Sequence, residues 1–132
     1  MKKIKVLCGL IFNTKDELLI TRRLGGDFSG KWEFPGGKLE EHESEQDCLI
    51  REIKEELDIE IIIDSFFMRN EFTYPNILVE LISYISKYKS GDIKLVDHDK
   101  YEWVQINRLK EFDFLDGDLS IINNILSKKI IN

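Results

Sequence analysis

The sequence predicts an α+β fold in which a mixed β-sheet packs against two helices. Several segments rich in Ile, Val, Leu and aromatic residues have the continuous apolar or two-residue pattern of strands. Two other segments, one in the middle and one near the C-terminal end, repeat their apolar residues about every 3.6 positions, as amphipathic helices do. Strands mixed with two helices in this way give an α+β or α/β sandwich.

The chain is predicted to begin with a β-hairpin. Lys3–Phe12 is rich in Ile, Val and Leu and forms a buried strand, whereas Asn13–Asp16 is a polar turn. Glu17–Thr21 then returns as the second strand. Three glycines with an Asp and a Ser make residues 24–31 a loop, because these residue types favour turns over regular structure.

A short extended segment, Trp32–Phe34, leads towards the first helix. Pro35-Gly36-Gly37 is predicted to break this segment, because proline and glycine interrupt regular structure. From Ser44 to Leu57 the period changes to that of a helix, with Ser44 as its N-cap and Asp47 as the acid of a capping box. The apolar stripe of this helix consists of Leu49, Ile50, Ile53 and Leu57.

The second half of the chain is predicted to contain further strands and a closing helix. A turn at Tyr74-Pro75-Asn76 separates two of the strands, and Leu119–Ile130 has the spacing of a helix. No internal repeat or linker is visible, so residues 1–132 are expected to form a single domain. The expected strands are Ile59–Phe67, Glu71–Tyr74, Ile77–Tyr88 and Tyr101–Ile106.

The composition argues against several classes of protein. The formal net charge of −6 disfavours binding of polymeric nucleic acid through a basic surface, although a small phosphorylated ligand stays compatible if a metal ion supplies positive charge. No segment approaches the ~20 apolar residues of a membrane helix, and the N-terminal apolar run is too short for a signal peptide. The two cysteines suggest no disulfide framework. We therefore expect a cytoplasmic monomer or homodimer that acts away from membranes.

Three glutamates share one side of the predicted first helix. At about 100° per residue, Glu55 lies about 60° to one side of Glu52 and Glu56 about 40° to the other, next to the apolar stripe. Clustered carboxylates of this kind suit a hard divalent cation such as Mg²⁺ or Mn²⁺. A solvated acidic face is the alternative, and the helix alone does not decide between the two. The preceding Gly36 and Gly37 favour the metal site, because their backbone can approach a ligand closely.

The stretch GKLEEHESEQDCLIREIKEELDI, residues 37–59, resembles the Nudix box, G-x5-E-x7-R-E-U-x-E-E-x-G-U, in which U is a bulky aliphatic residue. The glycine after the helix is replaced by Asp58. Because Asp tolerates the left-handed conformation better than most residues, the turn is expected to persist. The matching residues are Gly37, Glu43, Arg51, Glu52, Ile53, Glu55, Glu56 and Ile59.

The resemblance to the MutT-type branch of the Nudix hydrolases covers essentially the whole chain. Four segments show this resemblance: LLITRR before the loop, WEFPGGKLE at the start of the Nudix box, the expected strand that contains Trp103, and DFLDGDLSII. It implies an α/β/α sandwich with a mixed central sheet and a catalytic helix. The implied activity is Mg²⁺-dependent conversion of a nucleoside triphosphate and water into the monophosphate and pyrophosphate, with attack at the β-phosphorus. The expected substrates are modified or non-canonical nucleotides such as 8-oxo-dGTP, or cytosine nucleotides, which implies a role in DNA repair.

The resemblance also assigns roles around the expected metal. Asp97 precedes Trp103 at a position where the family usually has the longer Glu, so Asp97 is expected to act through water. Glu52 is our first choice for the catalytic base and Asp97 the second. Glu43 and Arg51 are expected behind the ligands, with Arg51 orienting a carboxylate through a bidentate contact. The implied metal ligands are the carbonyl of Gly36 and the carboxylates of Glu52, Glu55, Glu56 and Asp97.

Five residues are candidates for binding the nucleotide. Arg23 resembles a family position that contacts phosphate or sugar, with a surface arginine as the alternative. A nucleobase needs a flat apolar slot with a few hydrogen-bonding groups, and Phe34, Tyr74, Asn76 and Asp118 are the candidates by position. Phe34 could equally be a core residue. Asp118 could equally be the N-cap of the last helix.

Base selection is expected to depend on Asp118. An ionised Asp accepts hydrogen bonds and donates none, which suits the N4 amino group of cytosine or the N1–H and N2 amino groups of guanine. An Asp at this position is more typical of family members that act on cytosine nucleotides, so the resemblance slightly favours cytosine.

The two histidines and Cys48 are not expected to take part in catalysis. Neither His42 nor His98 has metal-ligand spacing, so both are expected at the surface. Cys48 is expected to be a packing residue because no base accompanies it.

Two alternatives stay open at this point. The chain could be a Nudix hydrolase of ADP-ribose, a nucleotide sugar or a dinucleoside polyphosphate, although those branches commonly carry extra elements. It could also be a non-catalytic nucleotide-binding regulator on the same fold, although binding alone does not require Glu52, Glu55 and Glu56 together. Release of pyrophosphate from a panel of nucleotides with Mg²⁺ separates these possibilities.

Overall fold

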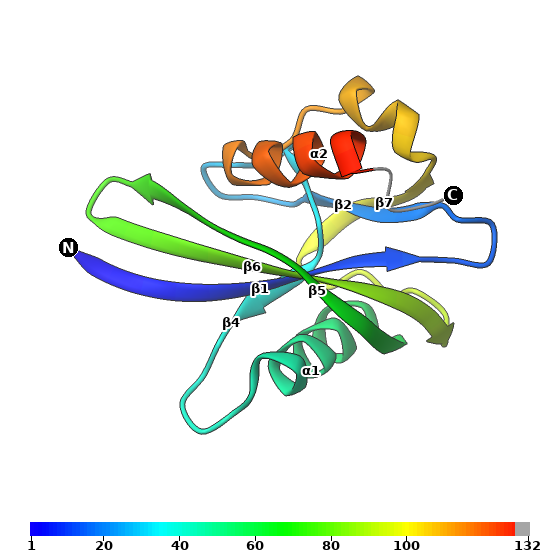
Figure 1. Ribbon diagram of the computed structural model, residues 1–132, viewed down its shortest axis with the longest axis horizontal. Coiled ribbons are helices and arrows are strands. Elements are labelled where there is room, and N and C mark those ends of the chain that lie inside the picture. The colour runs from blue at the N-terminus through cyan, green and yellow to red at the C-terminus, as the bar shows by residue number, and fades with distance from the viewer. Residues whose placement is uncertain (129–132) are drawn as a thin grey trace.

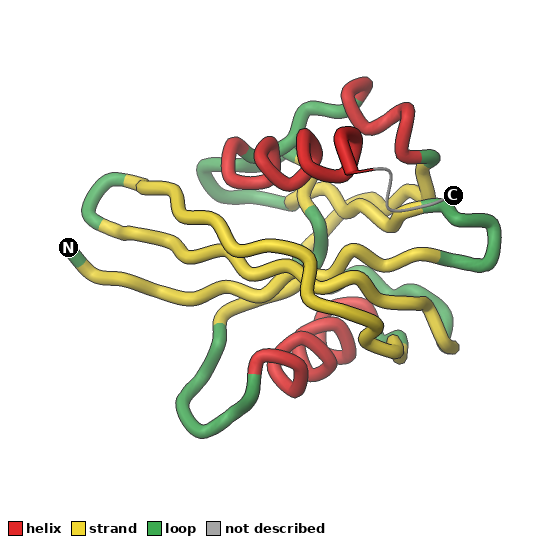
Figure 2. The backbone as a smooth tube through the Cα atoms, viewed as in Figure 1, coloured by secondary structure: helices red, strands yellow, loops and turns green. Residues whose placement is uncertain are grey.

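The computed structural model describes residues 1–128 as a curled sheet between two helices (Figure 1). Helix α1, Glu45–Leu57, lies on one face and helix α2, Asp116–Lys128, on the other, as Figure 2 also shows. The predicted sandwich of a mixed sheet and two helices is confirmed. The strands are β1 Lys2–Phe12, β2 Leu18–Arg23, β3 Trp32–Glu33, β4 Gly36–Lys38, β5 Glu60–Tyr74, β6 Ile77–Ser90 and β7 His98–Val104, and a 3₁₀ helix, η1, spans Ile106–Glu111.

The sheet is mixed because β1 pairs in parallel with β6, whereas the other strand pairs are antiparallel. Its order is β3-β2-β1-β6-β5, with β7 beside β2. Strands β1 and β2 are paired only next to their turn, at Phe12 and Leu18, and β4 takes the place of β2 beside Val6–Cys8. The sheet therefore opens between β4 and the pair of β2 and β3. Among residues 1–128, neither helix is both long enough and apolar enough to span a membrane.

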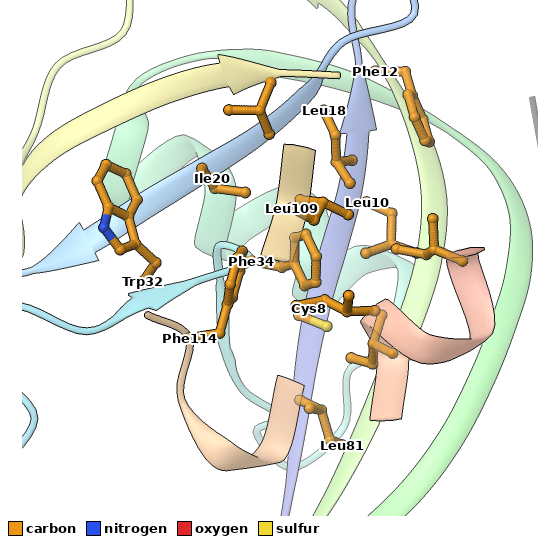
Figure 3. Close-up of a cluster of buried hydrophobic side chains, with 14 residues drawn as sticks. Cys8, Leu10, Phe12, Leu18, Ile20, Trp32, Phe34, Leu81, Leu109 and Phe114 are labelled. Carbon is orange, nitrogen blue, oxygen red and sulfur yellow. The ribbon is translucent and has the colours of Figure 1, made fainter. Parts of the chain in front are cut away.

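Alternation along β1 builds a hydrophobic core on each face of the sheet. Side chains of Cys8, Leu10 and Phe12 belong to the cluster under α2, which Figure 3 shows, whereas Leu7 and Ile11 belong to the cluster under α1. This is the two-residue period of a strand buried on both sides. Helix α1 contributes Cys48, Leu49, Ile53 and Leu57 to its cluster, but the predicted stripe residue Ile50 lies at the edge of the stripe and is 44% exposed.

The N-cap Ser44 and the left-handed turn at Asp58 are formed at the ends of α1 as the sequence predicts. The Ser44 hydroxyl accepts a hydrogen bond from the Asp47 amide at 3.1 Å, which satisfies one of the free donors of the first turn. At the other end Asp58 adopts the left-handed conformation, with φ 56°, and its amide donates to the carbonyl of Lys54. The reciprocal half of the capping box is not formed, since within residues 1–128 the Asp47 side chain makes no hydrogen bond to Ser44.

The predicted break after the short extended segment is confirmed, because β3 ends at Glu33, but Gly36 and Gly37 then form a separate strand, β4, that was not predicted. Strand β4 pairs with β1, with Cys8 opposite Gly36. A Cβ atom on Gly36 would collide with the backbone of Leu7. Glycine thus allows a close approach of two strands here instead of ending one.

Several boundaries in the second half of the chain also differ from the prediction. The two strands expected around Phe67 and Tyr74 are one strand, β5, whose irregularities at residues 60–61, 63–65 and 66–68 disturb the apolar alternation. Strand β7 begins at His98, and η1 was not predicted. Helix α2 begins at Asp116, so Asp118 lies inside the helix and is not its N-cap. The predicted end of this helix at Ile130 lies outside the described residues.

Candidate active site

A cavity of about 440 Å³ lies where the sheet opens, and its wall combines an apolar part with an acidic part. The apolar part comes mainly from β1, β5, β6 and the segment before α2, whereas the charged and ionisable part comes from α1, α2, the ends of β2 and β3, and the residues around the start of β7. The apolar residues include Val6, Cys8, Phe34, Phe72, Val79, Leu81 and Leu115, and the charged or ionisable ones include Arg23, Glu33, Glu56, Asp97, His98 and Asp118.

Strand β4 brings the backbone of Gly37 against the carboxylate of Glu52. A Cβ atom on Gly37 would collide with that carboxylate, so the close contact requires glycine. The Glu52 side chain is only 14% exposed, and burial raises the pKa of its carboxyl group. Gly36 and Gly37 also line the cavity, as the prediction of a glycine backbone beside the ligand requires.

Arg51 connects the acidic side chains of this region. Its guanidinium donates to both carboxylate oxygens of Glu43, at 2.9 and 2.7 Å, which is the expected bidentate contact. It also donates to Glu52 at 2.9 Å and to Glu55 at 3.2 Å. The Arg51 contact lowers the pKa of Glu43 to about 2. Arg51 therefore orients Glu52 from behind, whereas Glu55 is directed to the solvent side, with 58% of its side chain exposed.

Glu56 is a partly buried carboxylate of α1 that forms no ion pair with a Lys or Arg side chain within residues 1–128. Desolvation raises the pKa of Glu56 to about 7, and the charges of Glu52, Asp97 and Glu33 act in the same direction. Its side chain is 19% exposed and lies 3.9 Å from the imidazole of His98. Asp97 lies at the exposed rim of the cavity, next to the end of β2, where its carbonyl accepts from the Leu24 amide at 3.2 Å.

The expectation that both histidines lie at the surface is correct for His42 and wrong for His98. The His98 residue is 4% exposed and its Nε2 atom lies 2.9 Å from a carboxylate oxygen of Glu33. Glu33 also accepts two hydrogen bonds from Arg23, at 3.1 and 3.2 Å. Arg23 thus lines the cavity but is already paired with a carboxylate. Neither Glu33 nor His98 was predicted at the site; the place of Glu33 in the segment WEFPGGKLE, which leads into the Nudix box, was the available signal for Glu33.

Asp118 is buried inside the cavity wall instead of capping α2. The residue is 5% exposed, and one oxygen of its carboxyl group accepts a hydrogen bond from the Phe34 amide at 3.0 Å. Desolvation raises the pKa of Asp118 to about 8. Burial therefore favours the neutral acid over the ionised form that was expected from the sequence. A neutral carboxyl group can donate one hydrogen bond as well as accept.

The aromatic candidates differ in their surroundings. Phe34 is both a core residue and part of the cavity wall, with its ring centroid 5.3 Å from that of Phe114. Tyr74 lines the cavity and packs against Phe28 and Phe72 at 5.2 and 5.1 Å between centroids. Asn76 is exposed in the turn after Tyr74, with φ 67°, and is not among the residues that line the cavity. Its left-handed backbone explains why asparagine suits that position.

Cys48 packs beneath the site and has no nucleophilic character. Its side chain is fully buried, with Sγ 3.5 Å from the carbonyl of Lys38. Burial raises the pKa of Cys48 to about 12, so the thiol stays protonated. The expectation of a packing residue is confirmed.

The predicted metal ligands lie in one region but do not form a closed ligand set. Within residues 1–128, no group of three or more His, Cys, Asp or Glu side chains has the geometry to hold a metal ion. Arg51 draws Glu52 and Glu55 towards itself, while Glu56 is directed to His98. The site therefore places an apolar slot beside carboxylate oxygens whose negative charge is not fully offset by nearby positive side chains.

Comparison with known proteins gives consistent results for the sequence and the fold. The sequence profile of the NUDIX domain matches residues 1–124. A Buchnera aphidicola protein named 8-oxo-dGTP diphosphatase is 31% identical over 118 residues, which cover 89% of this chain and 94% of that protein. A CTP pyrophosphohydrolase of Escherichia coli (strain K12) is 25% identical over 127 residues, covering 96% and 94%. The crystal structure of the MutT protein from Methanosarcina mazei Go1 has a TM-score of 0.88 and 25% identity, covering 98% and 97%.

Proposed function

Because this chain belongs to the NUDIX domain family, we propose that it is a MutT-like hydrolase that converts a nucleoside triphosphate and water into the monophosphate and pyrophosphate. Cleavage of a phosphoric anhydride bond is the reaction named for its relatives, an 8-oxo-dGTP diphosphatase and a CTP pyrophosphohydrolase. The observation that supports it best is the cavity, where an apolar slot for a base adjoins the acidic edge of α1. A nucleoside triphosphate matches both parts of the cavity, because its base could occupy the apolar slot while its phosphates lie at the acidic edge with a bound cation.

We assign Mg²⁺, with Mn²⁺ as a substitute, to this acidic edge. The donor set fits a hard cation because it consists of oxygen atoms, and desolvation raises the pKa values of Glu52 and Glu56. Once bound, the cation would neutralise phosphate oxygens and promote deprotonation of water. The residues that would hold it are Glu52, Glu55, Glu56, Asp97 and the carbonyl of Gly36.

The chain's own residues would orient the phosphates and move the proton. Water forms a bond to the β-phosphorus, and the bond from that phosphorus to the bridging oxygen breaks, so the monophosphate leaves. Glu52 accepts the proton, because Arg51 and Gly37 fix its carboxylate beside the cavity. Asp97 at the rim is the second candidate for this role. Arg23 is available to phosphate or sugar if it exchanges one of its contacts with Glu33.

The Gly37→Ala substitution tests the placement of Glu52. The added Cβ displaces a carboxylate end, not the backbone, so kcat is expected to fall by about 10–100-fold with little change in thermal midpoint. Gly36→Ala is the matched comparison, because its Cβ meets the Leu7 backbone and should destabilise the fold itself. Circular dichroism melts and steady-state kinetics distinguish the two. Equal kcat in Gly37→Ala and the unsubstituted enzyme would contradict the role of Glu52.

Asp118→Asn tests base recognition. In the variant the amide oxygen can keep the bond from Phe34, which leaves an NH₂ group that donates only. Cytosine presents its N4 donor, whereas guanine also presents the O6 acceptor. The ratio of kcat/KM for cytosine over guanine nucleotides is therefore expected to fall by about ten-fold at a pH above 8, where the carboxyl group of Asp118 is ionised and only accepts hydrogen bonds. Asp116→Asn, an exposed neighbour on the same helix, should leave the ratio unchanged.

The same variant makes a prediction about stability. The carboxyl group of Asp118 has its usual pKa near 3.8 in the unfolded chain and a pKa of about 8 in the fold. Between these values the unfolded chain releases the proton first, so the folded state loses stability as the pH rises from 4 to 8. The thermal midpoint of Asp118→Asn minus that of the unsubstituted protein should increase over this range. A flat difference would show that the buried carboxyl does not titrate as proposed.

The remaining features of the proposal concern the whole protein. Residues 1–132 would form one Nudix hydrolase domain, a cytoplasmic monomer or homodimer that acts on small nucleotides and does not bind polymeric nucleic acid. Removal of damaged nucleotides would be its contribution to DNA repair. Light scattering decides the oligomeric state. A panel of nucleoside triphosphates, with 8-oxo-dGTP, ADP-ribose and dinucleoside polyphosphates included, tests the reaction through its products. A triphosphate releases pyrophosphate, whereas ADP-ribose gives AMP and ribose 5-phosphate, so nucleotide products are measured as well. No turnover of any triphosphate would refute the proposal.

A further inference from the structure

The imidazole of His98 is buried between two carboxylates that come from different layers of the fold. Its side chain is 2% exposed. Glu33 belongs to β3 in the sheet, whereas Glu56 belongs to α1. A shift of pairing register between Arg22 and Arg23 places His98, the first residue of β7, opposite Arg23. The ring therefore lies where the sheet and the carboxylate helix meet.

Glu33 fixes the orientation of the ring. The Nε2 atom of His98 lies 2.9 Å from Glu33, and because a carboxylate only accepts hydrogen bonds, this nitrogen carries the proton. Glu33 is itself held by two hydrogen bonds from Arg23. The other ring nitrogen, Nδ1, is thereby directed towards α1.

The Nδ1 atom and Glu56 have few other partners. Nδ1 is sealed from solvent and has no hydrogen-bond partner within residues 1–128, and a carboxylate oxygen of Glu56 lies 3.9 Å away. In the same part of the chain, Glu56 makes no other ion pair. Glu52, by contrast, is oriented by Arg51. The approach of Nδ1 to Glu56 is longer than a hydrogen bond, but within residues 1–128 it is the one ion-pair contact between Glu56 and a strand of the sheet.

We propose that His98 is a positioning residue, which transmits the fixed geometry of Arg23 and Glu33 to Glu56 and so sets the place of this carboxylate beside the nucleotide cavity. The inference rests on the proposed function, in which Glu56 helps to hold the divalent cation. Groups behind metal ligands commonly change metal affinity or activity about 10–100-fold when removed. His98 would be such a group behind a metal ligand. The residues that hold it, Glu33 and Arg23, themselves line the nucleotide cavity.

Three substitutions separate the two contacts of the ring. His98→Gln can keep a donor near Glu33, His98→Asn can keep a polar group near Glu56, and His98→Leu removes both. Thr21→Val is the matched control, because it deletes a buried hydrogen bond to the Glu33 backbone and leaves every side chain of the network in place. Binding of Mn²⁺ is measured by calorimetry without nucleotide, alongside kcat, KM and thermal midpoints.

His98→Leu is expected to weaken Mn²⁺ binding and lower kcat by about ten-fold or more, with KM changed less than about three-fold. The Gln and Asn variants should lie between His98→Leu and the unsubstituted enzyme, and they remain informative if the Leu variant does not fold. Thr21→Val should lose only stability. If all three His98 variants bind Mn²⁺ as the unsubstituted enzyme does, His98 is a packing residue and the inference fails while the proposed function stands. If the unsubstituted enzyme neither binds Mn²⁺ nor hydrolyses triphosphates, the proposed function fails, and this inference with it.

Discussion

Replacement of Glu56 by Gln is expected to lower kcat by about 10²–10³-fold while the protein stays folded. Glutamine keeps the shape of the side chain but removes the negative charge, and catalysis of phosphoryl transfer is mostly electrostatic. The fold should tolerate the change, because burial already disfavours the charged form of Glu56, whose pKa is raised to about 7. Turnover at saturating Mg²⁺ and circular dichroism at the same pH measure the two effects separately.

Asp47→Asn provides the matched control for this variant. Asp47 is an exposed acid on the same helix, and unlike Glu56 it is not among the residues that line the cavity. The control should therefore keep kcat within about two-fold, in line with the small effects of surface substitutions. Near-normal turnover in Glu56→Gln, with the control also active, would remove Glu56 from the proposed ligand set.

Removal of divalent cations is expected to abolish hydrolysis completely, and addition of Mg²⁺ in excess over the chelator should restore it. The reason is that Glu52, Glu56 and Asp97 add negative charge to a region that also has to receive phosphates. A cation that binds only the folded state also stabilises it, by about 2.7 kcal/mol at a concentration 100 times its dissociation constant. Thermal melts with increasing Mg²⁺ measure this stabilisation without any substrate.

The melts also provide the control for the metal experiment. The rise in thermal midpoint with Mg²⁺ should be smaller in Glu56→Gln than in Asp47→Asn, because only the first substitution removes a proposed ligand. Full hydrolysis in the presence of excess chelator would exclude the metal mechanism, whatever the melts show.

Features that depend on short segments of sequence were predictable. The ends of α1 at Ser44 and Asp58 follow from capping preferences, which are local, and the carboxylate arc follows from helical spacing. The close approach of the Gly37 backbone to Glu52 agrees with the glycine and glutamate positions of the Nudix box, although strand β4 itself was not predicted. These signals lie within a single continuous stretch, so no knowledge of the tertiary arrangement was required.

Features that depend on contacts between distant segments were not predictable in the same way. Asp118 has the residue type of an N-cap, but its carboxyl group reaches the amide of Phe34, which is 84 residues away in sequence. His98 is buried because the pairing of β2 with β7 brings it to Glu33. The irregular pairing of β5 with β6 interrupts the apolar alternation, so one long strand has the sequence pattern of two short ones. Burial by remote elements reversed the local preference for Asp118 and His98, whereas for β5 irregular pairing with β6 disturbed the apolar pattern.

The alternation of side chains along β1 also determines how the protein loses its structure. Cys8 and Leu10 support the core under α2, while Leu7 and Ile11 support the core under α1, so a single strand is shared by both. If β1 leaves the sheet, both faces lose their packing at once, and neither helix has an independent apolar surface left to cover. Unfolding is therefore expected to be cooperative, with one thermal transition of the same midpoint whether the probe is Trp32 in one cluster or Trp103 beside the other.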